Sequence, residues 1–342
     1  MRRLAQAHPQ NNSAVPHAIW APLTAFAATL VIVWWLVRSR FSDLVLDHPN
    51  QRSLHSLPVP RGGGIGIHAG IVLAWLTIHP PLPFTLWLAF ALLFAVSLTD
   101  DLRGVPVAIR FIIYLLAAYL FAADLLRAES GLPAALLMTL ALAWMANLYN
   151  FMDGADGLAG GMALSGFSFY GIAAWLTGDH PFALANFSIA AAAAAFLIFN
   201  FHPARIFMGD VGAVPLGFFA GALGLLGWLR HDWPWWLPPL VFSPFIVDAS
   251  VTLLRRMVRR ERVWQAHRDH YYQRLVQLGW GHRGTAMAEY ALMAVCGGAA
   301  LLMLSLAPTA QWIALGIAAV LYLLLMAIVE NAWRRFEAGR RT

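Results

Sequence analysis

The sequence predicts an all-α integral membrane protein whose chain crosses the bilayer many times. Of its 342 residues, 60% are hydrophobic and only 12% are charged, whereas a soluble domain carries about 25% charged residues. Long apolar runs also recur along the whole chain, and short stretches rich in Pro, Gly and charge separate them. No low-complexity linker divides the chain, so we expect residues 1–342 to form a single membrane-embedded domain.

Each spanning helix needs roughly 17–25 mostly apolar residues. By this rule the chain contains about eleven spans, and we expect the ends of each to shift by a few residues. The expected spans are residues 18–38, 63–79, 84–99, 107–124, 133–149, 160–177, 183–200, 212–228, 237–254, 285–306 and 311–330.

The distribution of arginine predicts which side of the membrane each loop faces. Most of the basic residues fall in alternate loops, and loops of this kind face the cytoplasm. We therefore expect a periplasmic N-terminus and a cytoplasmic C-terminus. Trp228, Trp233, Trp235 and Trp236 would then form an aromatic belt at the outer interface. The cytoplasmic loops that we expect to carry function are residues 39–62, 100–110, 150–160, 200–211 and 255–284.

Acidic residues gather at the cytoplasmic ends of the expected helices. Asp100 and Asp101 end the third span. Asp153 and Asp156 follow the fifth span, and Asp210 follows the seventh. We expect these carboxylates, which come from three separate loops, to converge on one site at the membrane surface. The acids of transporters, in contrast, tend to lie near the middle of the membrane.

Carboxylates that cluster in this way repel one another unless positive charge lies among them. Mg²⁺ takes oxygen ligands and commonly links one or two carboxylates to the phosphates of a substrate. Basic side chains in the same set of loops, such as His267, Arg268 and His270, suit phosphate oxygens. The residues therefore indicate metal-assisted phosphoryl chemistry at the bilayer surface.

Each of these features also has a plainer interpretation. An Asp-Asp pair at a helix end is usually a solvated cap, and residues 267–270 fit an ordinary basic loop that binds anionic lipid headgroups. A proton-coupled transporter would also carry acids in the membrane, and Asp248, inside the ninth expected span, fits that alternative best. A phosphotransferase of the CDP-alcohol type is a third alternative, but its DGxxAR signature is absent from the stretch DGADGL that begins at Asp153.

Five segments, taken in order along most of the chain, resemble one known family, the polyprenyl-phosphate N-acetylhexosamine-1-phosphate transferases. This family includes the phospho-N-acetylmuramoyl-pentapeptide transferases and the undecaprenyl-phosphate GlcNAc-1-phosphate transferases. The third and fourth segments are the most specific. The segments are DHPNQRSLH…PVPRGGGIGI (47–67), SLTDDLRG (97–104), NLYNFMDGADGLAGG (147–161), NFHPARIFMGDVGAVPLG (200–217) and AHRDHYYQRL (266–275).

The resemblance implies a reaction in which a sugar-1-phosphate passes from a UDP-N-acetylhexosamine to undecaprenyl phosphate and UMP is released. It implies Mg²⁺, or Mn²⁺ in its place, as the cofactor. In a single displacement, an oxygen of the lipid phosphate attacks the β-phosphorus of the nucleotide sugar. A two-step route through an aspartyl phosphate stays open, because carboxylates also act as nucleophiles.

The same resemblance assigns roles around the expected metal. Asp210 would be the main metal ligand. Asp100 and Asp101 would contribute to the metal site and to catalysis, and Asp100 is favoured as the base that deprotonates or orients the lipid phosphate. Asn200 would orient the loop that carries the metal ligand.

On the nucleotide side, the resemblance assigns Asn150, Asp153 and Asp156, with Asp156 near the uracil. Phe207 would stack on the uracil ring, and its plainer interpretation is a core aromatic residue.

Two further loops border the expected site. His267, Arg268 and His270 match the loop that contacts the diphosphate and the sugar in the family. His55 and Arg61, together with the glycine run that follows them, belong to the first cytoplasmic loop.

Two positions differ from the peptidoglycan branch of the family. That branch carries a lysine four residues after the first aspartate of the pair, where this chain has Gly104, and we expect Arg110 to supply the missing positive charge. It also carries a run of histidines where this chain has HRDH. The differences favour the branch that starts O-antigen or another surface polysaccharide, with GlcNAc or a deoxy relative such as FucNAc or QuiNAc as the sugar. Phospho-N-acetylmuramoyl-pentapeptide transfer stays the alternative.

The resemblance also predicts where the protein works and with what. We expect it in the bacterial inner membrane, with the active site facing the cytoplasm. Its expected partners are the lipid bilayer, the UDP-sugar and undecaprenyl phosphate, and no nucleic acid. The family resemblance further suggests a homodimer.

Overall fold

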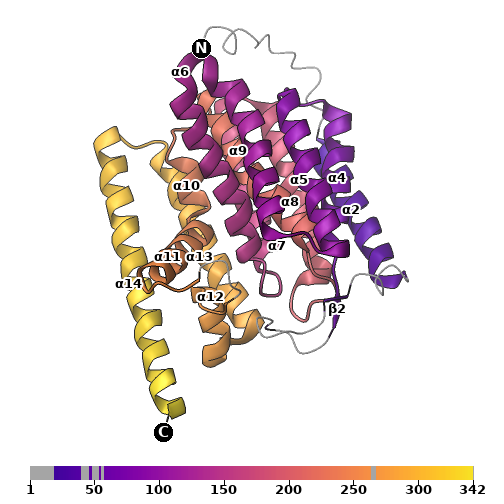
Figure 1. Ribbon diagram of the computed structural model, residues 1–342. Coiled ribbons are helices and arrows are strands. Elements are labelled where there is room, and N and C mark those ends of the chain that lie inside the picture. Colours follow the sequence, from indigo (N-terminus) through magenta and orange to yellow (C-terminus); the bar gives the residue numbers. More distant parts are fainter. Residues whose placement is uncertain (1–18, 40–45, 48–53, 55–57, 263–266, 342) are drawn as a thin grey trace.

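The computed structural model describes residues 19–39, 46–47, 54, 58–262 and 267–341, and these are almost entirely helical, as predicted. Most of the helices run side by side in one bundle (Figure 1). The described strands are β1 (Leu46–Asp47) and β2 (Val59–Pro60), which pair antiparallel. The helices are α2 (Trp20–Arg38), α4 (Gly63–Ile78), α5 (Phe84–Arg103), α6 (Val107–Phe151), α7 (Leu158–Thr177), α8 (His180–Asn200), α9 (Asp210–Leu229), α10 (Leu237–Val241), α11 (Ser243–Val258), α12 (Tyr271–Leu275), α13 (Gly281–Met303) and α14 (Pro308–Arg341), with a π-helical turn at Val276–Trp280.

The structure confirms a helical protein that crosses the membrane several times. Within the described residues, seven helical segments are both long and apolar enough to span a bilayer. Helices also cover the other predicted spans, but α4 has only 16 residues, and the predicted span 237–254 is divided at Phe242 into α10 and α11. The number of eleven spans and the side that each loop faces therefore stay predictions.

Helix α6 is a hairpin of two helices. As one straight rod its 45 residues would measure about 68 Å, which is twice the thickness of the hydrocarbon core. The backbone leaves the helical conformation at Gly131 (φ 80°, ψ 171°), just before Pro133. Arg110, near the start of α6, contacts Asp210, and Asp153, just beyond its end, interacts electrostatically with the same Asp210. Both ends of α6 therefore lie at one end of the bundle, as two separate spans require.

Helix α9 forms the centre of the bundle. It packs against α4, α5, α6 and α7, and nearly all of its side chains are buried. A helix that is apolar on every side belongs in the interior, and neighbouring helices surround most of α9. Helix α14 shows the opposite behaviour: it lies at the edge of the bundle (Figure 1), and its apolar segment is exposed, as a lipid-facing helix requires.

The expected aromatic belt is only half present. Trp228 and Trp235 are exposed, but Trp233 and Trp236 are buried. The indole N–H of Trp233 donates to the carbonyl of Gly224 (3.0 Å), and its ring stacks on Tyr170. The prediction was wrong for these two residues. The indole N–H of each has a hydrogen-bond partner inside the protein, so burial of the ring stabilises the fold more than a position at the membrane–water interface would.

The crossing of α4 over the start of α9 gives a first testable prediction. A Cβ atom added to Gly64 would lie 2.3 Å from the Cα of Gly212, so the two backbones would have to separate. We expect Gly64→Ala to destabilise the protein by about 1–3 kcal/mol, as overpacking does. The measurement is the apparent melting temperature of the purified protein in detergent. Gly298→Ala on α13 is the matched control, because an added Cβ there meets nothing within 4 Å. Equal melting temperatures for the two variants would contradict the close crossing.

Candidate active site

The predicted site residues gather at the end of the bundle that carries β2 and α12 (Figure 1). There, the segment that leads into α9 lies against the start of α4. The N–H of Phe207 donates to the carbonyl of Pro60 (2.8 Å), and the N–H of Gly63 donates to the carbonyl of Phe207 (3.0 Å). The N–H of Gly64 donates to the carbonyl of Met208 (2.9 Å). Two predicted loops that are far apart in the sequence are therefore joined through their backbones.

Asp101 caps the first turn of α9. From the last turn of α5, its Oδ1 accepts the N–H of Asp210 (3.1 Å) and its Oδ2 accepts the N–H of Val211 (2.9 Å). The first N–H groups of a helix have no partner within the helix and favour a negative charge. Gly209 has a φ of 75°, and a Cβ there would lie 2.7 Å from Oδ2 of Asp101. Glycine is therefore needed before Asp210 for Asp101 to reach the helix.

Asp100 and Asp210 share one guanidinium group. Arg110 forms an ion pair with Asp100, and its Nη1 also lies 2.9 Å from Oδ2 of Asp210. The second oxygen of Asp100 accepts the N–H of Val105 (2.6 Å). Arg110 therefore places its charge between two carboxylates that come from α5 and α9.

Asp153 completes this group of acids. Burial raises the pKa of Asp153 well above its usual range, and the nearby carboxylates of Asp210 and Asp101 raise it further. Arg61, which forms an ion pair with Asp47, acts in the opposite direction. We call the four acids Asp100, Asp101, Asp153 and Asp210, together with Arg61 and Arg110, the carboxylate cluster.

Asp156, three residues further on, belongs to a different group. Its Oδ2 lies 2.6 Å from Nδ1 of His202 and accepts the N–H of Ala204 (3.2 Å), and its Oδ1 lies 3.4 Å from Nδ1 of His282. Burial alone would raise the pKa of Asp156, but the interactions with His282 and His202 outweigh burial and leave the pKa below its usual range. Four of the five predicted acids therefore converge, and Asp156 lies among histidines.

Sequence reasoning missed both of these histidines. His202 lies inside the fourth segment, in NFHPAR, so its place in the motif was an available signal. His282 lies outside all five segments, and no spacing in the sequence connects it to Asp156.

Asn200 is a buried link between two loops. Its side-chain oxygen accepts the N–H of Gly157 (3.0 Å), and its side-chain NH₂ donates to the carbonyl of Ile206 (2.9 Å). It therefore fixes the start of α7 relative to the segment that leads to Asp210. Asn150, in the last turn of α6, and Phe207 are both half-buried.

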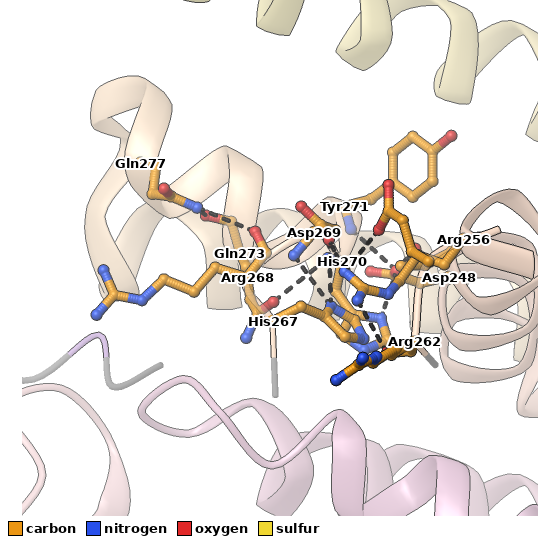
Figure 2. A network of polar contacts seen from close by, with 12 residues as sticks. Asp248, Arg256, Arg262, His267, Arg268, Asp269, His270, Tyr271, Gln273 and Gln277 are labelled. Carbon is orange, nitrogen blue, oxygen red and sulfur yellow. Dashed lines mark hydrogen bonds and ion pairs between the residues drawn. The ribbon is translucent and has the colours of Figure 1, made fainter. Parts of the chain in front are cut away.

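The predicted loop that contains His267 and His270 is anchored on α11 by Asp248 (Figure 2). The carboxylate of Asp248 accepts the N–H of Tyr271 and of Tyr272, both at 2.9 Å, and lies 3.2 Å from Nδ1 of His270. Protein donors occupy both of its oxygens. The transporter alternative, which relied on Asp248 as an ion site, therefore loses its best residue.

The predicted members of this loop differ in what they can do. His270 is buried and packs against Phe151, so it holds the loop in place. Burial, together with the nearby His270 and Arg256, lowers the pKa of His267 to about 4, so its imidazole is neutral at pH 7. Arg268 extends away from Asp248 and the two histidines (Figure 2). The guanidinium group of Arg268 brings a positive charge to this loop. The predicted site residue His55 lies outside the described residues.

The buried amide of Asn200 gives the second prediction. Asn200→Ala leaves the N–H of Gly157 and the carbonyl of Ile206 without these partners, and each loss costs about 1–3 kcal/mol. We expect a clear fall in the apparent melting temperature. Asn331→Ala, at an exposed position on α14, is the control and should leave it unchanged. If both variants melt like the wild type, Asn200 does not link the two loops.

Comparison with known proteins supports the same family as the sequence segments. Residues 83–227 match the model of glycosyl transferase family 4. The chain is similar to the probable undecaprenyl-phosphate N-acetylglucosaminyl 1-phosphate transferase of Bacillus subtilis (strain 168), with 26% identity over 90% of each chain. It is also similar to the undecaprenyl-phosphate alpha-N-acetylglucosaminyl 1-phosphate transferase of Yersinia pestis, with 26% identity over 85% of each chain. A phospho-N-acetylmuramoyl-pentapeptide-transferase of Symbiobacterium thermophilum is 35% identical, but over only 44% of this chain and 45% of its own. Together with the five segments, these matches support the polyprenyl-phosphate N-acetylhexosamine-1-phosphate transferases, within glycosyl transferase family 4, as the family that this chain resembles.

Proposed function

We propose that this protein transfers an N-acetylhexosamine-1-phosphate from a UDP-sugar to undecaprenyl phosphate. An oxygen of the lipid phosphate forms a bond to the β-phosphorus of the donor. The bond from that phosphorus to the bridging oxygen breaks, UMP leaves with this oxygen, and a lipid-linked sugar diphosphate remains. The carboxylate cluster, at one end of a membrane helix bundle in a chain that resembles this family, is the observation that carries the proposal.

The carboxylate cluster has the chemistry of a site for a hard divalent cation. Its donors are carboxylate oxygens, which Mg²⁺ and Mn²⁺ prefer, and the carboxylates of Asp210 and Asp101 add to burial in raising the pKa of Asp153. Arg110 already bridges Asp100 and Asp210, so a cation is tolerated between them. We propose that Asp210 and Asp100 hold the ion directly and that Asp101, whose oxygens cap α9, contributes mainly by fixing Asp210. When bound, the ion supplies positive charge that neutralises the diphosphate.

We propose that the other functions of the cluster are to activate the lipid phosphate and to bind phosphate oxygens. Asp100 is the proposed base that takes the proton from the lipid phosphate or orients its attacking oxygen. Arg110 and Arg61 bring guanidinium groups, which bind phosphate oxygens in a bidentate manner. On the other side, Arg268 is proposed to bind the donor diphosphate, with the neutral His267 beside it as a hydrogen-bonding group.

The uridine would lie next to the α6–α7 loop. Asn150 adjoins this loop, and Asp153 and Asp156 lie within it. Phe207 is half-buried, and we propose that its ring stacks on uracil. The proposal for Phe207 combines the two interpretations that the sequence left open.

For the sugar we propose GlcNAc or a deoxy relative such as FucNAc or QuiNAc, in a pathway that starts O-antigen or another surface polysaccharide. The relatives that cover 85–90% of the chain are named for N-acetylglucosaminyl transfer. Muramoyl-pentapeptide transfer is less well supported, because the relative with that name matches under half of the chain.

The test is UMP release by the purified protein in detergent, supplied with undecaprenyl phosphate, Mg²⁺ and one donor at a time. The donors are UDP-GlcNAc, UDP-QuiNAc, UDP-FucNAc and the UDP-muramoyl-pentapeptide. We expect release that needs both the lipid and the metal, with one of the first three donors. We expect Asp210→Asn to lower the rate by at least about 100-fold, because it weakens a metal ligand and the charge of the cluster.

Asp124→Asn is the matched control, since Asp124 is a carboxylate of α6 that bonds Thr85 rather than the cluster. It should keep wild-type turnover. Near-normal activity in a folded Asp210→Asn variant would refute the metal assignment, and no UMP from any donor would refute the proposed reaction.

We further propose that the carboxylate cluster faces the cytoplasm in the bacterial inner membrane. Ser130, at the turn inside α6, and Ala338, near the end of α14, are both exposed, and the native Cys296 is buried. In spheroplasts, a membrane-impermeant maleimide should label Ser130→Cys and leave Ala338→Cys unlabelled until the membrane is opened. The wild type gives the background from Cys296. The reverse pattern would show that the predicted orientation is inverted.

A further inference from the structure

Asp156, His202 and His282 present three ligand atoms that lie within 4.8 Å of one another. The residues come from three separate segments: the α6–α7 loop, the loop after α8, and the start of α13. The two imidazole rings are nearly parallel, with an angle of 10° and 5.4 Å between their centres. Both rings offer Nδ1 to the same carboxylate, at 2.6 and 3.4 Å. We call these three residues the histidine cluster.

The ligand atoms of the histidine cluster suit a different ion from those of the carboxylate cluster. Two imidazole nitrogens and one carboxylate oxygen form a donor set for zinc sites that keep an open position, whereas Mg²⁺ prefers oxygen alone. Zinc holds such ligands at about 2.0–2.2 Å, which places neighbouring ligand atoms about 3.3–3.5 Å apart in a tetrahedron. The 3.4 Å separation already fits, and the 2.6 Å separation needs to open by less than about 1 Å.

The surroundings orient the ligands. Nε2 of His282 lies 3.3 Å from the carbonyl of Leu54, and a carbonyl at this place keeps the proton on Nε2. The Nδ1 lone pair then points toward Asp156, whose own N–H donates to it (3.1 Å). A metal ion would compete with this N–H and would displace the proton between His202 and Asp156, so we expect moderate, micromolar affinity. The side chain of His202 is 41% exposed, which gives an ion access from solvent.

We propose that Asp156, His202 and His282 bind one divalent transition-metal ion of the zinc type, at a site separate from the carboxylate cluster. The bound ion would tie the α6–α7 loop, the loop after α8 and the start of α13 to one another. This inference rests on the geometry of the three side chains and does not depend on the proposed reaction.

The test measures zinc binding directly. The full-length protein in detergent is stripped with a chelator, supplied with excess Mg²⁺ to fill oxygen-only sites, and titrated with Zn²⁺ against a chromophoric chelator, without nucleotide. We expect one zinc per chain and a rise in the apparent melting temperature on binding. His202→Ala and His282→Ala should each weaken binding by at least about 10-fold. His79→Asn, at the C-terminal end of α4, should bind zinc like the wild type.

X-ray absorption on the zinc-loaded wild type keeps the test independent of whether the variants fold. We expect a first shell of nitrogen and oxygen with the scattering pattern of two imidazoles. Zinc bound equally well by the His202→Ala/His282→Ala double variant, a shell without imidazole, or no saturable zinc in the wild type would each overturn the proposal and leave an ordinary ion pair.

Discussion

The carboxylate of Asp101 at the first turn of α9 is the contact on which the rest of the site depends. A carboxylate removed from water is costly unless it is fully hydrogen-bonded, and here two backbone N–H groups of a helix N-terminus satisfy it. The same contact fixes the backbone of Asp210, because the N–H of that residue is one of the two donors. It also explains the glycine at position 209, where a Cβ would collide with the Asp101 carboxylate. The Asp-Asp pair (100–101) and the Gly-Asp pair (209–210) lie over a hundred residues apart in the chain. They therefore form one hydrogen-bonded contact in the fold.

The same arrangement recurs at the other side of the site. Asp248 on α11 caps the start of α12 through the N–H groups of Tyr271 and Tyr272, and it holds His270 as well. In both cases a carboxylate from a neighbouring helix satisfies the unpaired N–H groups of a helix start. The residues beside the cap, Asp210 in one case and the His267–His270 loop in the other, are positioned by it. Protein donors occupy both oxygens of Asp248, which is why an acid inside a predicted span was a poor guide to transport.

The ionisable residues at this end of the bundle form two groups that differ in their charge. In the carboxylate cluster, four acids and two arginines leave a deficit of positive charge that a hard cation and a phosphate-bearing substrate can share. In the histidine cluster, two imidazoles lie against the carboxylate of one acid, and neither arginine takes part. Asp153 and Asp156 are only three residues apart in the α6–α7 loop, but they face these two different surroundings because the loop turns between them, and the N–H of Gly157 is held by Asn200.

The sequence by itself determined the helical membrane fold, the family resemblance and most of the carboxylate cluster, because apolar runs of spanning length and acids at helix ends are local patterns. It also located the two halves of α6, since Gly131 and Pro133 mark the break. It did not determine which acids face one another. The surroundings of Asp101, Asp156 and Trp233 depend on contacts between segments that lie far apart in the sequence. These contacts bring Asp101 to the start of α9, Asp156 to two histidines and Trp233 to the protein interior. His282 became visible only in the fold, because its partner Asp156 lies 126 residues away in the chain. Side-chain spacing along the sequence carries no information about such pairs, and only the packing of the helices brings them together.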